Sequence, residues 1–264
     1  MASTPTSSPR FLVIPAAGLG SRMKSVYPEM CKELIPVGSK PAIQYAIEEG
    51  LDAGVEQIIV VLRPGKGNLR QVLSDLSLPI TFAWQEAPTG EANAIALTEP
   101  LVGGSAFAVI YPDCLCLPGP GALKSLVAVF NKSGQDVMGL ATITEENESF
   151  FGDAGKVDLE SVEEDLFRIK GLLPKGPGTF KRRFEEELRS VGMGVWGSHY
   201  FDAIRRVRPS ITEGEFTDGP VAALILRERG ILGTTLPGRV FDIGHPAGYR
   251  YCLDQLSQGH PCGD

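Results

Sequence analysis

A glycine-rich turn follows the first strand-like run of the sequence and could bind a phosphate group. The run is Phe11–Ile14, and the turn behind it contains Gly18, Gly20, Ser21 and Arg22. Glycine lets backbone N–H groups approach phosphate oxygens because no Cβ stands in the way, and arginine adds a rigid fork of donors. Taken alone, a G-x-G turn is more often a plain strand-to-loop connection. The turn is therefore only a candidate anion site.

Two common phosphate-binding motifs do not fit this turn. A dinucleotide fingerprint needs a third glycine where Met23 stands, and the next strand-like run ends in Leu62-Arg63 instead of an acidic residue. A P-loop needs a lysine directly after its second glycine, and the turn has none. The first suitable lysine is Lys32, in a loop bounded by prolines, from which it can fold back over the same phosphates.

The opening segment resembles the signature of the sugar-1-phosphate nucleotidyltransferases. That signature is approximately G-x-G-[ST]-R, a spacer, P-K-x-x-x-P-V and then K-P. The matching residues are Gly18, Gly20, Ser21, Arg22, Lys32, Pro36, Val37, Lys40 and Pro41. One departure is Cys31, where many relatives have proline. The resemblance implies transfer of a nucleotidyl group from a nucleoside triphosphate to a phosphorylated acceptor, with release of pyrophosphate.

The resemblance also implies which residues bind the nucleotide. Gln85 and Gly90 match the segment that reads the base, where the glutamine amide pairs with a pyrimidine edge. On its own, Gln85 would be an ordinary polar residue at a strand end. The contacts implied by the resemblance come from Ala17, Gly18, Gly20, Ser21, Gln85 and Gly90.

Charge neutralisation is the main task in this reaction, because two polyanions must meet. Asp113, in Tyr-Pro-Asp, and Asp242, in Phe-Asp-Ile-Gly, match the two strand-terminal aspartates of the family and imply a Mg²⁺ site. A single aspartate at a strand end is usually a cap or turn residue. The resemblance implies that Arg22 stabilises the departing pyrophosphate and that Lys32 contacts the α-phosphate. No general base is needed, because the attacking phosphate is already an anion.

The acceptor side matches the family less well. Lys175 fits the lysine that holds the acceptor phosphate, although a solvated loop lysine is an equally good interpretation. Pro174 stands where relatives have a glutamate that binds sugar hydroxyls, which makes a glucose acceptor less certain. Gly194 lies in a run, 192–197, that resembles the strand with acceptor contacts. The segment 214–218 resembles a family motif that we expect to be mainly structural.

These features favour an enzyme that joins UTP or dTTP, with CTP as a further option, to a sugar 1-phosphate. One alternative keeps the nucleotide and replaces the acceptor by a non-glucose phosphorylated or phosphonate metabolite. Another is a catalytically silent, nucleotide-binding regulatory subunit. Retention of Arg22, Lys32, Asp113 and Asp242 together favours the enzyme.

The composition excludes other classes of partner. The chain has 264 residues, a formal net charge of −7 and no Lys/Arg-rich run, which argues against nucleic acid and against an anionic membrane. No apolar run approaches the roughly 20 residues of a membrane helix. Five cysteines are few for this length and fit reduced thiols in the cytoplasm. Family members are often oligomers, so a homo-oligomer is compatible with the resemblance.

Apolar strand-like runs alternate with amphipathic helical stretches, which predicts an α/β fold. We expect a Rossmann-like mixed, mainly parallel sheet flanked by helices, of the nucleotide-diphospho-sugar transferase type, with a small acceptor-side insertion. Residues 1–10 have the composition of a disordered tail, and 11–264 form one domain whose acceptor-side region spans about 145–215. Strands are expected at 11–14, 57–62, 80–84, 106–111, 137–142, 192–197 and 234–240, with a hairpin at 156–173. Helices are expected at 42–53, 67–76, 91–98, 121–131, 180–189, 199–207, 221–229 and 248–255.

Overall fold

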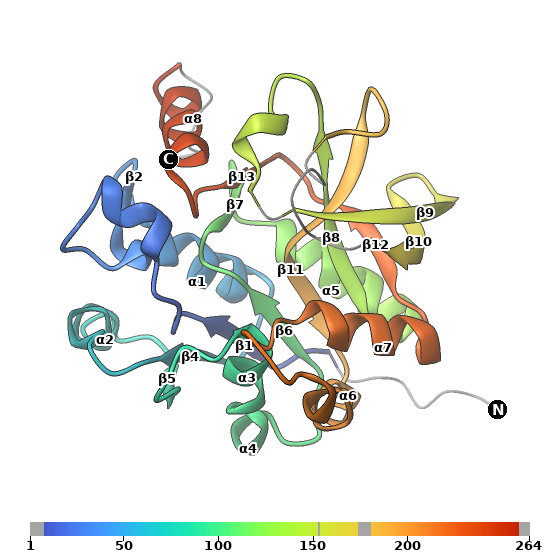
Figure 1. Ribbon diagram of the computed structural model, residues 1–264, viewed down its shortest axis with the longest axis horizontal. Coiled ribbons are helices and arrows are strands. Elements are labelled where there is room, and N and C mark those ends of the chain that lie inside the picture. Colours follow the sequence, from blue (N-terminus) through green and yellow to red (C-terminus); the bar gives the residue numbers. More distant parts are fainter. Residues whose placement is uncertain (1–7, 153, 174–180, 259–264) are drawn as a thin grey trace.

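The computed structural model describes residues 8–152, 154–173 and 181–258. A nine-stranded sheet runs through these residues in the order β5-β4-β1-β6-β11-β8-β12-β10-β9 (Figure 1). Its strands in chain order are β1 (Phe11–Pro15), β4 (Gln57–Leu62), β5 (Ile80–Trp84), β6 (Phe107–Ile110), β8 (Val137–Ile143), β9 (Gly155–Glu163), β10 (Leu166–Leu172), β11 (Glu187–Trp196) and β12 (Leu232–Thr235).

The sheet mixes parallel and antiparallel pairs. Strands β5, β4, β1 and β6 pair in parallel, and so do β8 and β12. Strand β11 runs antiparallel to both β6 and β8, and β10 runs antiparallel to β12 and β9. The hairpin predicted at 156–173 is the β9–β10 pair. The mixed α/β sheet expected from the sequence is thereby confirmed, and its parallel half carries the glycine-rich turn.

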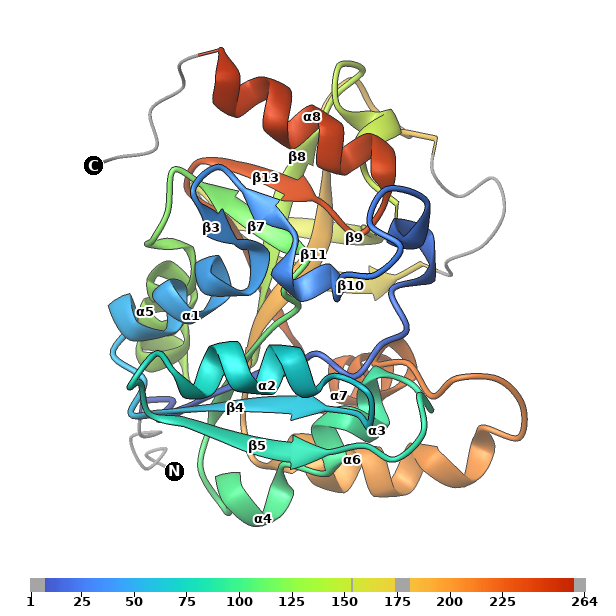
Figure 2. The same cartoon turned by 90° about the vertical axis from the view of Figure 1, so that its left-hand side faces the viewer.

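Helices cover both faces of the sheet. Helices α1, α2 and α5 share one apolar cluster with the strands, whereas α3, α6 and α7 share a second one; Figure 2 shows α2 alongside β4. The helices are α1 (Ala42–Asp52), α2 (Gly67–Ser74), α3 (Glu91–Ala96), α4 (Glu99–Val102), α5 (Ala122–Ser133), α6 (His199–Val207), α7 (Gly219–Arg229) and α8 (Pro246–Ser257). None of the helices in the described residues is long and apolar enough to cross a membrane.

Strand β4 shows why its sequence is apolar from Ile58 to Leu62. Ile58, Val60 and Leu62 belong to the cluster under α1, α2 and α5, and Ile59 and Val61 belong to the cluster under α3, α6 and α7. Successive side chains of a strand point to opposite faces, so a strand covered on both faces needs apolar residues throughout. The continuous apolar runs in the sequence follow from this double burial.

Two short sheets lie beside the large one. Strand β7 (Cys114–Leu117) pairs antiparallel with β13 (Arg239–Asp242), and β2 (Pro36–Val37) pairs with β3 (Lys40–Pro41). A third apolar cluster joins these strands to α8. The C-terminal part of the chain is thus packed against the segment that follows β6 and against the loop that contains Lys32.

The helix predicted at 180–189 is wrong over the residues that the structure describes. Residues 181–186 form bends, and β11 begins at Glu187. The charges that suggested a solvated helix face form ion pairs instead: Arg183 binds Glu187, and Arg182 Nε lies 3.1 Å from Glu148 Oε2. The segment therefore forms these ion pairs and pairs with β8 through β11, and it does not form a helix.

The single strand predicted at 234–240 is also wrong. The chain forms β12 up to Thr235 and then β13 from Arg239, and the two strands belong to different sheets. Pro237 and Gly238 separate them, and Gly238 has a φ of +83°, which favours glycine. The break carries the chain out of the large sheet and sets Asp242 next to Cys114.

Candidate active site

The glycine-rich turn lies at the carboxyl end of β1, in the parallel half of the sheet. Gly20 has a φ of +64° and precedes the 3-10 helix η1 (Ser21–Ser25). A Cβ added to Gly20 would lie 3.4 Å from Cβ of Lys32, so the lysine stem crosses directly over the turn. Gly18 is exposed, and a Cβ there would meet nothing within 4 Å, whereas Ala17 is buried in the core. The turn and Lys32 therefore form one surface.

Lys32, in the 3-10 helix η2 (Lys32–Leu34), pairs with Asp113 across the site. Lys32 Nζ lies 2.7 Å from Asp113 Oδ2, and about a fifth of each side chain is exposed. Burial alone would lower the pKa of Lys32, but the Asp113 and Glu33 carboxylates together outweigh it and raise that pKa. Burial would likewise raise the pKa of Asp113, but Lys32 holds it below its usual value. Both groups are thus kept charged.

Asp242 lies beside Asp113, with Gly244 between them. A Cβ on Gly244 would lie 2.7 Å from Asp113 Oδ2 and 3.1 Å from Asp242 Oδ1, so only glycine leaves room for both carboxylates. The backbone N–H groups of Gly152 and Gly244 donate to Asp242 at 2.8 Å and 3.0 Å. Burial and the neighbouring Asp113 carboxylate nevertheless raise the pKa of Asp242. The two acids form one negatively charged pair.

Arg22 reaches the same place from the far end of the turn. A Cβ on Gly152 would lie 3.2 Å from Arg22 Nη1 and 3.2 Å from Asp242 Oδ2. The structure therefore brings together four of the predicted residues, Arg22, Lys32, Asp113 and Asp242, although they come from distant parts of the sequence. Gly152 and Gly244 are the small residues that permit this approach.

The donor set of this pair fits Mg²⁺. Within residues 8–152, 154–173 and 181–258, no group of three or more His, Cys, Asp or Glu residues could hold a metal ion. Mg²⁺ does not need such a cage, because it usually takes one or two carboxylates and completes its shell with phosphate oxygens and water. Asp113 and Asp242 offer that number of carboxylates next to the two cations.

The segment predicted to read the base is held by backbone pairing. Gln85 is 5% exposed and its Nε2 donates to the carbonyl of Gly90 at 3.1 Å. Gly90 has a φ of +107°, and a Cβ there would lie 2.3 Å from the carbonyl oxygen of Phe216. Phe216 N donates to Thr89 O at 2.9 Å and Ala92 N donates to Phe216 O at 3.0 Å. The motif at 214–218 is thus the structural support of Gly90.

The acceptor side is described only in part. Lys175 and Pro174 lie outside the described residues. Gly194 does not reach the carboxylates: it is buried within β11, where a Cβ would meet Trp196 Nε1 at 2.9 Å and the Val137 carbonyl at 3.1 Å. Burial leaves Gly194 little surface for a ligand, and its role as an acceptor contact stays a prediction.

Gly192, two residues earlier in β11, is the better candidate for that contact. It is partly exposed, and a Cβ there would lie 2.9 Å from the Tyr111 side chain and 3.1 Å from Cys114 Cβ. Tyr111 and Cys114 flank Asp113 in the sequence. The motif at 192–197 does not indicate that Gly192 is partly exposed and Gly194 buried, so the sequence alone could not choose between the two glycines.

Two residues that the sequence did not single out also build the site. Gly152 lies where Arg22 and Asp242 come close together. His245 caps α8 by accepting from Gly248 N, and its Nε2 lies 2.9 Å from the Phe150 carbonyl oxygen. A glycine after two phenylalanines was the only signal for Gly152. The signal for His245 was its position directly before Pro246, which is the first residue of a helix.

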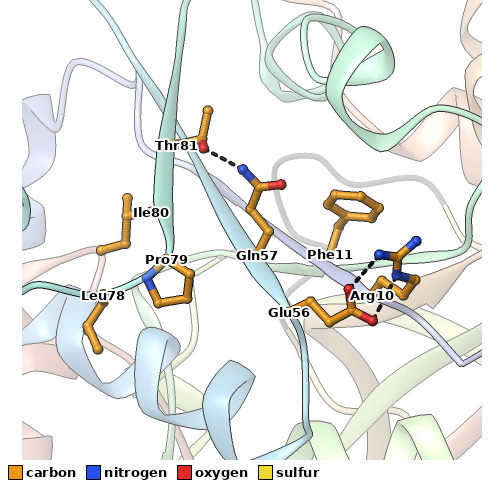
Figure 3. A pocket seen from close by; sticks show the side chains of 8 residues that line it. All are labelled: Arg10, Phe11, Glu56, Gln57, Leu78, Pro79, Ile80 and Thr81. Atoms are coloured by element: carbon orange, nitrogen blue, oxygen red, sulfur yellow. Dashed lines mark hydrogen bonds and ion pairs between the residues drawn. The ribbon is translucent and has the colours of Figure 1, made fainter.

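A separate pocket lies at the opposite ends of the same strands. Figure 3 shows its lining, which includes Phe11, Gln57 and Ile80, the first residues of β1, β4 and β5. Arg10 and Glu56 close one side with an ion pair. Ligands of open α/β sheets bind at the carboxyl ends of the strands, so this pocket is not the candidate active site.

Known proteins resemble this chain over nearly its whole length. A UTP–glucose-1-phosphate uridylyltransferase of Pseudomonas aeruginosa is 27% identical, with 92% of this chain and 96% of the relative covered. A Bacillus subtilis protein of the same name is also 27% identical, with 90% and 86% covered. The resemblance is thus spread across the chain and is not confined to its motifs.

Solved structures share the fold. A UDP-glucose pyrophosphorylase complexed with UDP-glucose has a TM-score of 0.80 at 23% identity, covering 95% of this chain and 99% of that one. A UTP-bound UGPase from Acinetobacter baumannii has a TM-score of 0.77 at 22% identity, covering 96% and 95%. The family model described as "Nucleotidyl transferase" matches residues 12–224. The chain belongs to the nucleotidyl transferase family.

Proposed function

We propose that this protein transfers a nucleotidyl group from UTP to a sugar 1-phosphate, giving a nucleotide-sugar and pyrophosphate. The observation that carries the proposal is the meeting of Arg22 and Lys32 with Asp113 and Asp242 at the carboxyl end of the parallel strands. The names of the uridylyltransferase relatives support UTP. dTTP and, after it, CTP stay as alternatives for the nucleotide.

The charges at this site suit attack by one phosphate on another. An oxygen of the acceptor phosphate forms a bond to the α-phosphorus, and the bond from that phosphorus to the pyrophosphate oxygen breaks. Lys32 is placed to bind the α-phosphate as negative charge gathers there, and Arg22 to bind the departing pyrophosphate. Asp113 and Asp242 would hold Mg²⁺, which supplies charge neutralisation at the phosphates when it is bound.

A second candidate exists for the acceptor, in place of glucose 1-phosphate. Pro174 replaces a glutamate that the family uses for sugar hydroxyls. A site without that carboxylate distinguishes less well between acceptors that carry those hydroxyls and acceptors that lack them, because this selectivity depends on buried polar partners. This substitution favours a non-glucose phosphorylated or phosphonate metabolite as the second candidate acceptor. The nucleotide half of the reaction is the same in both cases.

A pyrophosphate-release screen tests the proposal. UTP, dTTP, CTP, ATP and GTP are each combined with glucose 1-phosphate, other sugar 1-phosphates and phosphonates, with Mg²⁺ or with EDTA. We expect Mg²⁺-dependent release with one pyrimidine nucleotide, and loss of it in Lys32→Ala. Nucleotide binding without release for any acceptor would instead support a silent regulatory subunit. Absence of nucleotide binding would refute both.

The setting of the protein is also a proposal. Cys31, Cys114 and Cys116 are free thiols, and burial raises the pKa of Cys116 to about 12. Cysteines that stay as free thiols are typical of a reducing compartment such as the cytoplasm. Labelling of the thiols in protein isolated under alkylating conditions would test this, since disulfides among them would contradict it.

A further inference from the structure

We propose that Lys66 is a positioning residue for Lys32, acting through Glu33 and through the backbone of the glycine-rich turn. The inference rests on the proposed function, because the position of Lys32 matters only if the site transfers a nucleotidyl group. Lys66 lies in the loop between β4 and α2, directly before the first residue of that helix. It lies outside the sequence motifs described above.

The ammonium group of Lys66 is buried and bound to two internal acceptors. Its Nζ lies 2.7 Å from Glu33 Oε1 and 2.5 Å from the carbonyl oxygen of Ala16. Lys66 is 3% exposed and Glu33 is 1% exposed. Charges at such depth are costly unless they are paired and hydrogen-bonded. A buried lysine at this point therefore needs both acceptors to stay where they are.

The two acceptors belong to the two segments that form the phosphate side of the site. Ala16 directly follows β1 and leads into the glycine-rich turn, while Glu33 adjoins Lys32 in η2. One ammonium group thus holds the turn and the Lys32 segment together. The stem of Lys32 lies 3.4 Å from where a Cβ of Gly20 would be, so a shift of either segment moves Lys32 relative to the turn.

Lys66 itself is not placed to bind substrate. Its ammonium would have to leave Glu33 and Ala16 to reach a phosphate. Its backbone is fixed as well: Lys66 N donates to Arg63 O at 3.2 Å, and Arg70 N donates to Lys66 O at 3.2 Å. These bonds give Lys66 a route to the reaction through the groups that it holds.

Removing the ammonium group should lower turnover more than it weakens substrate binding. Misplacement of a catalytic group by about 1 Å can cost about 10²-fold in rate. We expect Lys66→Met to reduce kcat for pyrophosphate release by about 10-fold to 100-fold, with a smaller change in KM for the nucleotide. The Gln85 side chain donates to Thr89 and Gly90, whereas the Lys66 ammonium binds Glu33 and Ala16, so the segment proposed to read the base does not share these hydrogen bonds.

Loss of stability must be separated from loss of position. Lys66→Met leaves the Glu33 carboxylate buried without its ion partner, which lowers Tm. Leu73→Ala is the matched control: Leu73 is 1% exposed in the same helix, α2, and belongs to neither tied segment. It should lower Tm while kcat, measured well below Tm, stays within about twofold of the parent.

A double-mutant cycle tests whether Lys66 acts through Lys32. Lys66→Met is measured in the parent and in Lys32→Ala. If Lys66 positions Lys32, Lys66→Met should lower kcat by less than about threefold in the Lys32→Ala background, which is a smaller loss than in the parent. Equal losses in both backgrounds would overturn the proposal. So would a loss of kcat in Leu73→Ala as large as that in Lys66→Met.

Hydrogen exchange supplies a readout that needs no turnover. Lys66→Met should speed amide exchange in residues 16–20 and 31–35 relative to Leu73→Ala, and unchanged exchange in both segments would overturn the inference. The proposed function is tested separately by the parent and by Lys32→Ala alone. If the parent releases no pyrophosphate with any acceptor, that function fails, and the exchange comparison alone decides whether Lys66 holds the two segments together.

Discussion

Gly90→Ala should destabilise the protein and disturb the segment that we propose reads the base. The new Cβ would lie 2.3 Å from the Phe216 carbonyl oxygen, whereas real contacts of this kind are at least 3.0 Å, so the two backbones must separate. Separation weakens two hydrogen bonds, Phe216 N to Thr89 O and Ala92 N to Phe216 O. The strained φ costs about 1–3 kcal/mol and each bond about 0.5–1.5 kcal/mol, which predicts a loss of about 2–6 kcal/mol.

Urea unfolding at equilibrium measures this loss, and the KM for UTP and dTTP measures its effect on the Gln85 side. Gly219→Ala is the matched control, because it adds a methyl group at the first residue of α7, near the Phe216 segment, where nothing lies within 4 Å. Its free energy of unfolding should stay within about 0.5 kcal/mol of the parent. A Gly90→Ala variant as stable as that control would refute the steric reasoning.

Three further outcomes are expected. Lys32→Ala and Asp113→Ala should each lower kcat by about 10²–10³-fold with an unchanged circular dichroism spectrum, and turnover near the parent value would contradict the site. EDTA should abolish pyrophosphate release and added Mg²⁺ should restore it; release in EDTA would exclude a metal role for Asp113 and Asp242. Burial raises the pKa of Glu49, which accepts from Gly121 N and Leu123 N at the start of α5. The folded state therefore binds this proton more tightly than the unfolded state, and stability falls as pH rises above about 4.5; urea unfolding should show Glu49→Gln gaining on the parent between pH 4 and 7.

The parts of the fold predicted correctly are those in which local sequence and burial agree. Strand β4 is apolar from Ile58 to Leu62 because both its faces are covered there, and the loops that contain Gly20 and Lys32 carry their chemistry in contiguous motifs. The strand-to-helix alternation around them was therefore readable. Aspartates 113 and 242 could be assigned as a pair only through the resemblance, because nothing local relates them.

The failures are places where distant contacts decide the conformation. Residues 181–189 look helical by composition, but Arg183 pairs with Glu187 and β11 pairs with β8. Gly192 and Gly194 lie in the same strand, but Gly192 is partly exposed and Gly194 is buried, and the sequence motif does not show this difference. Lys66 and Glu33 are ordinary charged residues in the sequence, and only the folded chain buries them against each other. Side-chain pairing at long sequence separation leaves no local signal.

The pairing of β7 with β13 also bears on how the site arises during synthesis. Its register sets Asp242 opposite Cys114, so the second carboxylate is synthesised long after the first one, Asp113. Closing so long a loop is entropically costly and tends to come late in folding. A nascent chain that has completed β7 holds Asp113 and Lys32 but not Asp242. Chains that stop before β13 should therefore be unable to consume nucleotide, and activity should appear only after Asp242 is added and β13 has paired with β7.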